Sequence, residues 1–335
     1  MTLQSKIIQT RDLNTSFFCN IGEIKAVRGV SFHLNEKEVV GIVGESGSGK
    51  SVTSLSILKL LQHPGKIKNG DIFFKNERLN DKSNKEMRRI RGNRIAMIFQ
   101  DPMTSLNPVF TVENQIVEVI KKHQKISGKQ AREKALGLLK LVGIPSPEKR
   151  MKSYPHECSG GMRQRIMIAI ALSCEPDVLI ADEPTTALDV TIQAQILDLL
   201  KELKDKMNTS IILITHDLGV VANLCSRIIV MYGGMIMESG TVKEIYSDPR
   251  HPYTVGLMKA IPRISFDEKK KLTPILGSPP DLLNPPEGCP FSPRCEWAMR
   301  ICMEKTPPFK TLNKDRGAMC WLLHKDAPKV DFGLK

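Results

Sequence analysis

The most constraining feature of this 335-residue chain is a glycine-rich segment, GESGSGKS, at residues 44–51. It matches the pattern G-x-x-x-x-G-K-S and follows an apolar run at residues 39–43 that is typical of a buried strand. Glycines at these spacings let backbone N–H groups wrap a chain of phosphates. We expect Lys50 to reach the β- and γ-phosphates and the Ser51 hydroxyl to ligate Mg²⁺. The segment therefore predicts a phosphate-binding loop.

The residues after the loop predict a helix whose N-terminus faces the phosphates. Apolar residues recur there at helical spacing and favour one buried apolar face; they are Val52, Leu55, Leu58 and Leu61. The helix dipole and the free amides of the first turn favour bound anions. The residues expected to line the phosphates are Gly44, Ser46, Gly47, Ser48, Gly49, Lys50, Ser51 and Val52.

Composition limits the classes of partner. The net charge of +13 is compatible with nucleic acid, an anionic membrane surface or nucleotide. Aromatic residues make up only 5% of the chain, too few for base-stacking platforms, so we favour a membrane surface over nucleic acid. Solvated charge without a partner is an equal alternative. No apolar stretch approaches the roughly 20 residues that span a bilayer, and residues 1–7 lack a signal-peptide core. We therefore expect a chain that stays in the cytoplasm.

The first half of the chain changes from strand to helix character. Residues 5–43 favour short strands, and two more strands are predicted at 66–74 and 94–100. Residues 111–175 then show helical periodicity. This pattern predicts a helical insert within a sheet-containing core.

The second half resumes α/β alternation and then loses regular structure. Short apolar runs at 178–181 and 211–214 predict buried parallel strands, separated by a helix at 192–206. Residues 227–239 predict strand again, with a Gly-Gly turn. After about residue 255, paired prolines exclude long helices and predict a loop-rich segment.

Two acidic residues follow the apolar run at residues 178–181. Phosphoryl transfer needs Mg²⁺ and a positioned water. Asp182 can reach the metal or its water shell, and Glu183 can orient or deprotonate the attacking water. A plain strand-to-loop transition would look the same in isolation. Beside a phosphate loop, the catalytic interpretation is favoured.

A second candidate anion site lies at residues 158–165, CSGGMRQR, before an apolar helical run. A helix start with Ser and two Gly can bind anions, although an ordinary N-cap is the alternative. The motifs follow one another in the order phosphate loop, Phe99-Gln100, Ser159-Gly160-Gly161, Asp182-Glu183, Ala187-Leu188-Asp189 and Thr215-His216-Asp217. In this order, residues 5–250 resemble the nucleotide-binding domain of ATP-binding-cassette (ABC) proteins.

The resemblance implies a role for each motif. Gln100 is similar to the glutamine that senses Mg²⁺ and the γ-phosphate and couples to membrane subunits. Residues 159–161 are similar to the signature motif, which contacts the ATP of an opposing domain. Asp189 resembles the aspartate at the dimer interface, and His216 resembles the switch histidine that contacts the γ-phosphate. Glu183 and Asp182 keep the catalytic and Mg²⁺ roles given above.

Three positions leave alternatives open. Phe17 is the expected aromatic for stacking on adenine, with Phe18 as its rival and a core role equally compatible with either. In the signature motif, Cys158 stands where Leu or Phe is usual and Met162 replaces the frequent Gln. Because the Ser-Gly-Gly backbone is intact, we expect its phosphate contact to be retained.

Longer segments resemble one branch of the family. They are FQDPMTSLNP at 99–108, YPHE at 154–157, DPRHPY at 248–253 and GCPFSPRC at 288–295. Together they are similar to the ATP-binding subunits of oligopeptide and dipeptide importers. The resemblance implies a second ATPase subunit or a homodimer mate, two transmembrane permease subunits, an external peptide-binding protein, and a location at the cytoplasmic face of the membrane.

Two alternatives accompany this resemblance. Relatives of the branch also import nickel or oligosaccharides, so the resemblance specifies the type of transporter more closely than the transported substrate. A DNA-maintenance or translation ATPase shares the same core but usually carries a long coiled coil or two tandem cassettes. This chain has one cassette and no sustained heptads. We therefore expect no nucleic-acid partner.

Four of the eight cysteines crowd into the last 47 residues with the spacing C-x5-C-x6-C-x17-C; they are Cys289, Cys295, Cys302 and Cys320. In a reducing compartment such a group points to metal rather than disulfides. Four thiolates suit zinc or an iron–sulfur cluster, and the lack of a C-x2-C pair weakens a zinc ribbon. The resemblance suggests a structural 4Fe–4S cluster, beside ATP and Mg²⁺ as the other cofactors. Zinc, and cysteines that are unligated or disulfide-linked, are the alternatives.

The resemblance also implies the fold and the domain bounds. We expect an α/β fold of the RecA-like phosphate-loop class with an antiparallel β subdomain and an inserted helical subdomain at about 101–175. The nucleotide-binding domain would span 1–255, and a loop-rich, cysteine-containing extension would span 256–335.

Overall fold

The computed structural model describes residues 5–186, 188–260 and 274–333. The chain divides into two compact units, and each is described by itself. The first consists of Met1–Ile7, Leu34–Glu38 and Asp81–Ile214. The second consists of Ile8–His33, Val39–Asn80 and Thr215–Lys335.

Parallel strands form the sheet of the first unit. β6 (Ile95–Ile98), β7 (Val178–Asp182) and β8 (Ser210–Thr215) pair in that order. Every residue of β7 and β8 is buried, which explains why these strands are continuous apolar runs rather than alternating ones. α8 (Val190–Met207) connects β7 to β8. The strands and the helix predicted here from the sequence are confirmed.

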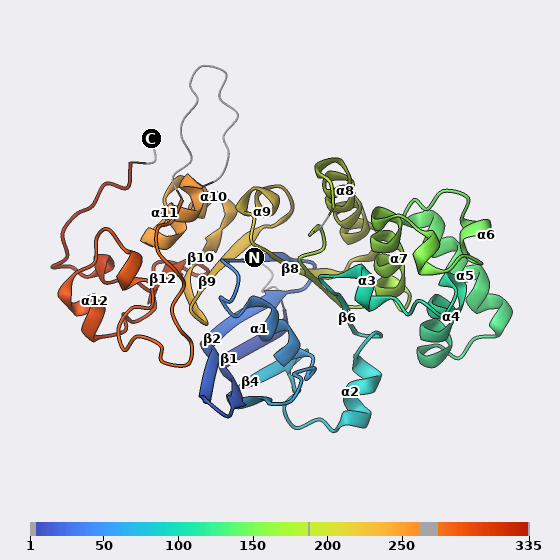
Figure 1. Cartoon of the computed structure of the whole chain (residues 1–335), viewed down its shortest axis with the longest axis horizontal. Helices are drawn as coiled ribbons and strands as arrows, with labels where there is room; N and C mark the ends of the chain where they lie inside the picture. Colours follow the sequence, from blue (N-terminus) through green and yellow to red (C-terminus); the bar gives the residue numbers. More distant parts are fainter. Residues whose placement is uncertain (1–4, 187, 261–273, 334–335) are drawn as a thin grey trace, which may run out of the picture. The chain divides into compact units, whose positions relative to one another are not determined.

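Helices occupy the sequence between β6 and β7. α4 (Val112–His123), α5 (Gly128–Leu141) and α7 (Gly160–Leu172) pack against one another (Figure 1). The shorter elements of this unit are α2 (Asn84–Ile90), α3 (Pro102–Ser105), α6 (Pro147–Arg150) and η1 (Pro155–Glu157). The helical character predicted for 111–175 is confirmed, while the bounds of the subdomain stay a prediction.

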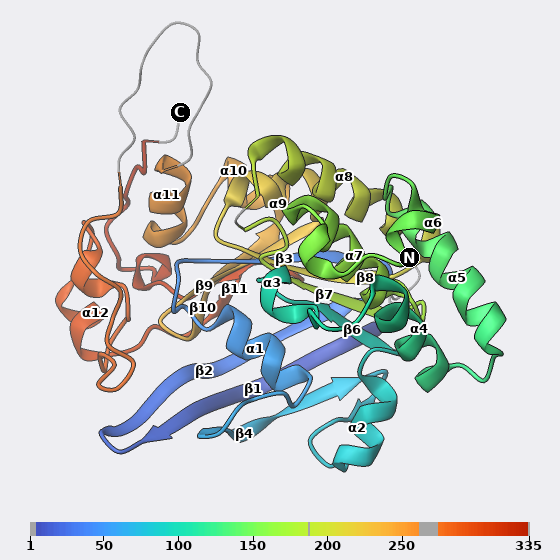
Figure 2. The same ribbon diagram turned by 45° about the vertical axis from the view of Figure 1, so that its right-hand side comes forward.

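Long antiparallel strands form one sheet of the second unit. Its order is β2-β1-β4-β5, with β1 (Lys6–Cys19), β2 (Gly22–Asn35), β4 (Gly65–Phe74) and β5 (Glu77–Arg78). Figure 2 shows β1, β2 and β4 side by side. β1 and β2 contain 14 residues each, so the prediction of short strands was wrong for residues 6–35, while the short buried strand at 39–43 is confirmed as β3 (Val39–Val43). Only a two-residue turn separates β1 from β2, and no proline interrupts either strand.

The helix after the phosphate loop differs from its prediction. α1 (Lys50–Ile57) buries Thr53, Ser54 and Ser56 beside Ile57, while Val52 and Leu55 are only half-buried. Two of these hydroxyl groups, those of Thr53 and Ser56, are tolerated inside because they bond to backbone carbonyls of the same helix. Thr53 Oγ1 donates to Gly49 O at 2.9 Å, and Ser56 Oγ donates to Val52 O at 2.7 Å. The helix also ends before Leu61, so the expected apolar face was wrong.

A second group of strands carries the phosphate loop. β3 (Val39–Val43) pairs in parallel with β9 (Arg227–Tyr232), which forms an antiparallel hairpin with β10 (Met235–Thr241). Three helices of this unit follow in sequence: α9 (Leu218–Leu224), α10 (Val242–Ser247) and α11 (Pro252–Lys259). The predicted strand and glycine turn at 227–239 are confirmed as the β9–β10 hairpin.

The C-terminal residues add short elements only. They are η2 (Ser292–Arg294), α12 (Arg300–Glu304), β11 (Lys310–Thr311), β12 (Gly317–Ala318) and η3 (Trp321–Leu323). β12 pairs with β10 and also with β11. The loop-rich character predicted from the prolines is confirmed for residues 274–333.

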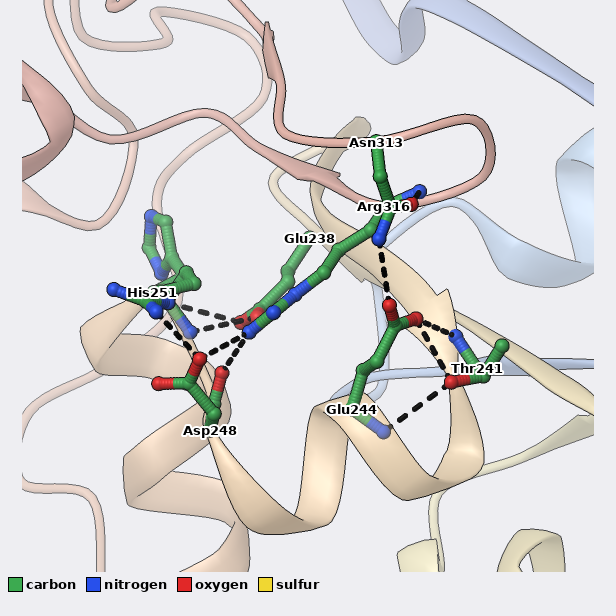
Figure 3. Close-up of polar contacts among 8 residues, drawn as sticks. Glu238, Thr241, Glu244, Asp248, His251, Asn313 and Arg316 are labelled. Atoms are coloured by element: carbon green, nitrogen blue, oxygen red, sulfur yellow. Dashed lines mark hydrogen bonds and ion pairs between the residues drawn. The ribbon is translucent and has the colours of Figure 1, made fainter.

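Polar side-chain contacts fasten this segment to α10 and to Asp248, the residue that follows α10 (Figure 3). Arg316 binds the carboxylate of Asp248 at 2.8 Å, and Asn313 Nδ2 donates to Glu244 Oε1 at 2.7 Å. Glu244 also accepts from the N–H of Thr241 in a capping box at the start of α10. The C-terminal segment is therefore an integral part of the second unit.

Candidate functional site

The phosphate loop connects the buried strand β3 to α1, as predicted. Gly44 has φ 155° and Gly49 has φ 97°, both outside the range of most side chains. A Cβ on Gly44 would lie 2.1 Å from Met231 O, and one on Gly49 would lie 2.5 Å from Ala26 O. Glycine is therefore required at both positions by backbone conformation and by space.

Lys50 is buried and points into the curve of the loop. Its Nζ donates to Gly44 O and Glu45 O, each at 2.8 Å, and lies 3.4 Å from Ser48 Oγ. Two backbone carbonyl oxygens of the loop thus surround the ammonium group. Lys50 is therefore held against the loop backbone, and its contact with the β- and γ-phosphates stays a prediction.

Gln100 and Glu183 meet in the first unit. Gln100 Nε2 donates to Glu183 Oε2 at 3.0 Å, although the residues lie 83 positions apart in sequence. Glu183 follows β7 with a φ of 45°, which is strained for a residue with a side chain. Its N–H donates to Ile214 O at 2.9 Å. The strained backbone, the hydrogen bond from its N–H and the hydrogen bond to its side chain together hold the Glu183 carboxylate in one direction.

Sequence analysis missed one contact of this carboxylate. Thr186 Oγ1 donates to Glu183 Oε2 at 2.9 Å. Asp182, the residue before it, is buried at the end of β7. The sequence signal that could have indicated this contact is the position of Thr186, whose hydroxyl lies three residues after the candidate base Glu183.

Two helix starts carry the other motifs of this unit. Ser159 caps α7 by accepting from Met162 N, and Ser159 and Gly160 are exposed. Asp189 caps α8 by accepting from Ile192 N at 2.9 Å, and it is exposed as well. The predicted helix start at the signature motif is confirmed. Cys158 is buried, which raises the pKa of its thiol, so it serves as a small apolar residue beneath the motif.

His216 and the two phenylalanines belong to the second unit. His216 follows β8 directly and is exposed. Phe17 is half-buried, and its ring lies over Gly65, where an added Cβ would come within 2.7 Å of Phe17 Cε1. Phe18 is 43% exposed. Packing over Gly65 gives Phe17 a role in the sheet, and adenine stacking stays a prediction for either ring.

The four C-terminal cysteines line one pocket together with His251, Phe291 and Trp321. No disulfide joins them. Burial raises the pKa of Cys289 and of Cys295 to about 11, and that of Cys320 to about 12. The thiols of these three residues are therefore protonated at neutral pH unless a metal displaces the protons.

Four thiols are suitable ligands for a soft metal, but they are not arranged to coordinate one. Within residues 5–186, 188–260 and 274–333, no group of three or more His, Cys, Asp or Glu is placed to hold a metal ion. The predicted iron–sulfur cluster therefore has no formed ligand set here.

Comparison with known proteins agrees with the fold and the motifs. The sequence pattern described as "ABC transporter" matches residues 27–186, and that described as "Oligopeptide/dipeptide transporter, C-terminal region" matches residues 237–302. The oligopeptide transport ATP-binding protein OppD of Bacillus subtilis is 56% identical over 98% of this chain and 92% of its own. The dipeptide transport ATP-binding protein DppD of Bacillus subtilis is 55% identical over 95% of each chain.

Solved structures give the same fold. The dimeric ATP-binding cassette MJ0796 bound to ADP and Pi has a TM-score of 0.64 and 29% identity, covering 70% of this chain and 98% of its own. The structure of cbiO1 from Clostridium perfringens, part of the ABC transporter complex cbiONQ, has a TM-score of 0.62 and 29% identity, covering 73% of this chain and 92% of its own.

These findings define an ATPase of the ABC class, with a phosphate loop, a strained glutamate after β7 and a signature helix start. The chain belongs to the ABC transporter family, in its branch of oligopeptide and dipeptide ATP-binding proteins. In the parts of the chain that the structure describes, no helix has the length and apolar character needed to cross a bilayer.

Proposed function

We propose that this chain is the ATP-binding subunit of an importer and hydrolyses ATP to drive uptake of di- or oligopeptides. The observation that carries the proposal is the match of residues 237–302 to the C-terminal region of oligopeptide and dipeptide transporters, in a chain similar to such proteins along almost its whole length. Import of nickel or oligosaccharides by the same kind of machine is the second candidate.

The proposed assembly contains a second, related ATPase subunit or another copy of this chain. Two transmembrane permease subunits and an external peptide-binding protein complete it. The dimeric arrangement described for a cassette of similar fold supports a facing mate. Peripheral attachment at the cytoplasmic face of the membrane follows from this assembly, and the net charge of +13 favours an anionic surface.

Each site residue has a proposed role in the reaction. ATP binds through the loop residues and Lys50, and Ser51, Gln100 and Asp182 hold Mg²⁺ or its water shell. Bound Mg²⁺ would supply positive charge to offset the negative charge that develops on the phosphates. Glu183 orients the attacking water and takes its proton, supported by the bonds that Gln100 and Thr186 donate to its Oε2.

The remaining motifs act across the dimer. His216 senses the γ-phosphate, while Ser159, Gly160 and Gly161 contact the ATP held by the mate, and Asp189 lies at the dimer interface. ATP favours the closed pair because the signature motif contacts it only in that state. Hydrolysis removes the γ-phosphate and the pair reopens.

We also propose that Cys289, Cys295, Cys302 and Cys320 hold a structural metal centre, an iron–sulfur cluster rather than zinc. Support comes from the four thiols sharing one pocket and from the absence of a disulfide between them. Bound metal would supply cross-linking that loop-rich residues cannot obtain from a core of their own.

An uptake assay tests the cargo. Cells lacking the gene are supplied with the wild-type gene or with Glu183→Gln, and labelled dipeptide, oligopeptide, nickel and oligosaccharide are offered separately. We expect the wild type alone to restore peptide uptake. Restoration of nickel or sugar uptake instead would select the second candidate, and co-fractionation with ribosomes or DNA rather than membranes would point away from transport.

Metal analysis tests the cysteine proposal. Protein purified without oxygen should contain about four iron atoms per chain and show the visible absorption of an iron–sulfur cluster. Cys295→Ser should remove both signals. Zinc in place of iron would reject the cluster, and a metal-free chain would reject any metal centre.

A further inference from the structure

The segment between the first two C-terminal cysteines packs against the residues beside the phosphate loop. Phe291 is only 3% exposed. Its ring lies 5.4 Å from that of Tyr232 and 5.3 Å from that of Tyr253, measured between centroids. Tyr232 is the last residue of β9, and Tyr253 is the second residue of α11. The segment is therefore anchored in an aromatic cluster within the second unit.

Arg294, at the end of η2, extends from this anchor to the loop itself. Its Nη1 donates to Glu45 Oε2 at 2.7 Å and its Nη2 donates to Glu45 Oε1 at 3.2 Å. Glu45 is the second residue of the phosphate loop, 249 positions earlier in the sequence. The contact is a two-point guanidinium–carboxylate pair, which fixes direction as well as distance.

The other N–H groups of Arg294 are also used. Nη1 donates to Tyr232 Oη at 3.0 Å, Nη2 to Ile275 O at 3.0 Å and Nε to Leu276 O at 2.8 Å. All five N–H donors of the guanidinium thus have acceptors. The side chain is 6% exposed, and its pKa is raised because Glu45 and Tyr232 offset the cost of burial. The group is held rigidly.

Glu45 passes this constraint to the nucleotide-binding atoms. Its N–H donates to Tyr253 Oη at 2.8 Å, and its carbonyl oxygen accepts from Lys50 Nζ at 2.8 Å. The side chain, the N–H and the carbonyl of one residue are therefore each held by a different partner. Movement of the carboxylate would shift the peptide that contacts the phosphate-binding lysine.

We propose that Arg294 is a positioning residue for the phosphate loop, through which the C-terminal extension sets the affinity of the site for MgATP. The structure gives the extension a role in the ATPase reaction that is separate from any metal it holds and from the cargo transported. Arg294 acts on Glu45, Glu45 fixes the loop peptide, and the loop presents Lys50.

Substitution of the pair tests the proposal in the full-length chain. Arg294→Lys keeps the charge but loses the two-point geometry, and Glu45→Gln keeps the shape but loses the charge. Each is expected to weaken MgATP binding about tenfold, measured with a fluorescent ATP analogue, and to raise the KM for ATP more than it lowers kcat. The double variant should bind no more weakly than the weaker single variant, because both remove the same contact.

Arg316→Lys is the matched control. Arg316 is also a mostly buried arginine of the extension, 13% exposed at its side chain, but it binds Asp248 instead of the loop. This change should lower the midpoint of thermal unfolding and leave MgATP affinity within about twofold of wild type. A general loosening of the extension is thereby separated from an effect on the loop.

Three outcomes would overturn the proposal: unchanged affinity in Arg294→Lys, losses that multiply in the double variant, or an equal loss of affinity in Arg316→Lys. Should Arg294→Lys fail to fold, Tyr232→Phe replaces it, since this change removes one acceptor of the same guanidinium and leaves the Glu45 carboxylate in place. A loss of affinity of about twofold or more would then support the proposal, and unchanged affinity would reject it.

Discussion

Glu183 combines three features that rarely coincide in one residue. It has a φ of 45°, two side-chain donors on one carboxylate oxygen, and a position at the end of a fully buried strand. A strained backbone persists only where neighbouring bonds fix it, and such strain is concentrated at functional sites. The backbone and the two donors therefore fix the direction of the Glu183 carboxylate, which the proposed role in orienting water requires.

Replacing this carboxylate should separate binding from turnover. Glu183→Gln keeps an oxygen and the size of the side chain but cannot accept a proton. We expect MgATP binding to be retained and the rate of ATP hydrolysis to fall about 10²- to 10⁴-fold. Steady-state hydrolysis and nucleotide binding measured on the same preparation check this, with Glu202→Gln, an exposed change on α8, as the control. Unchanged turnover would remove Glu183 from the catalytic role.

Glu238 is a buried carboxyl group near the residues that fasten the C-terminal segment (Figure 3). Burial raises its pKa from 4.5 to about 7, although the N–H groups of Arg250 and His251 donate to its oxygens. Because the folded-state pKa is the higher one, the native state binds the proton more tightly. Its contribution to stability is full below about pH 4.5 and is lost as the pH rises to about 7.

His251 contributes with the opposite sign. Burial lowers its pKa from 6.5 to about 3, so its contribution is present above pH 6.5 and is lost as the pH falls. The two effects oppose each other between pH 4.5 and 6.5, and a difference measurement isolates the carboxyl group.

In urea unfolding at several pH values, the free energy of unfolding of wild type relative to that of Glu238→Gln should fall by about 2 kcal/mol between pH 5 and 7, because the His251 contribution is common to both proteins and cancels in the difference. Parallel curves for the two proteins across this range would contradict the assignment.

At the scale of elements, local sequence signals were sufficient where burial is simple. β7 and β8 were predictable because every residue of each is buried, so the apolar runs had no polar alternation to confuse them. The buried face of α1 was not predictable. The hydroxyl groups of Thr53 and Ser56 donate hydrogen bonds to backbone carbonyls, so these residues can be buried like apolar ones. Residue type alone does not reveal that bond.

The residues of the candidate site likewise divide into those that local sequence predicts and those that it does not. Gly44, Gly49 and Lys50 were predictable because backbone conformation and charge demand those residue types in a short segment. The contact of Arg294 with Glu45 joins residues 249 positions apart, so no local pattern encodes it. Long-range contacts of this kind require the folded chain.

The capping box of α5 offers an element-scale test. Ser127 Oγ accepts from Gln130 N, and Gln130 Oε1 accepts from Ser127 N at 2.9 Å. Ser127→Ala leaves an N-terminal amide of α5 without its acceptor and should cost about 1 kcal/mol of unfolding free energy. Urea denaturation measures this, and Ser127→Asp, which keeps an acceptor, should cost much less. Equal losses in the two variants would show that the cap is not the cause.

At the scale of the whole molecule, the proposed reaction needs two chains. Ser159 and Gly160 are exposed at the start of α7, so they are available to a facing nucleotide. The exposed Val190, 81% accessible, lies beside Asp189 and would be covered in such a pair. These features favour a site that is completed by a mate.

A bulky signature residue should abolish pairing without abolishing binding. In a Glu183→Gln background, ATP should double the apparent mass of the chain, alone or with its related subunit, because the pair cannot reopen by hydrolysis. Adding Ser159→Arg should keep MgATP affinity and abolish the increase in mass, since the signature contacts only the mate's nucleotide. Light scattering measures both states. Pairing that survives Ser159→Arg would place the interface elsewhere.

The short strands β11 and β12 have a consequence for handling this protein. β12 satisfies backbone groups of β10 on the side away from β9, at Glu238 and Ser239. A chain cut before residue 310 would leave that edge open, and unpaired edges recruit other chains. We therefore expect shortened chains to precipitate or form fibrils through this open strand edge, even though no catalytic residue is removed. In the full-length chain, β12 keeps β10 from pairing with another copy of the protein.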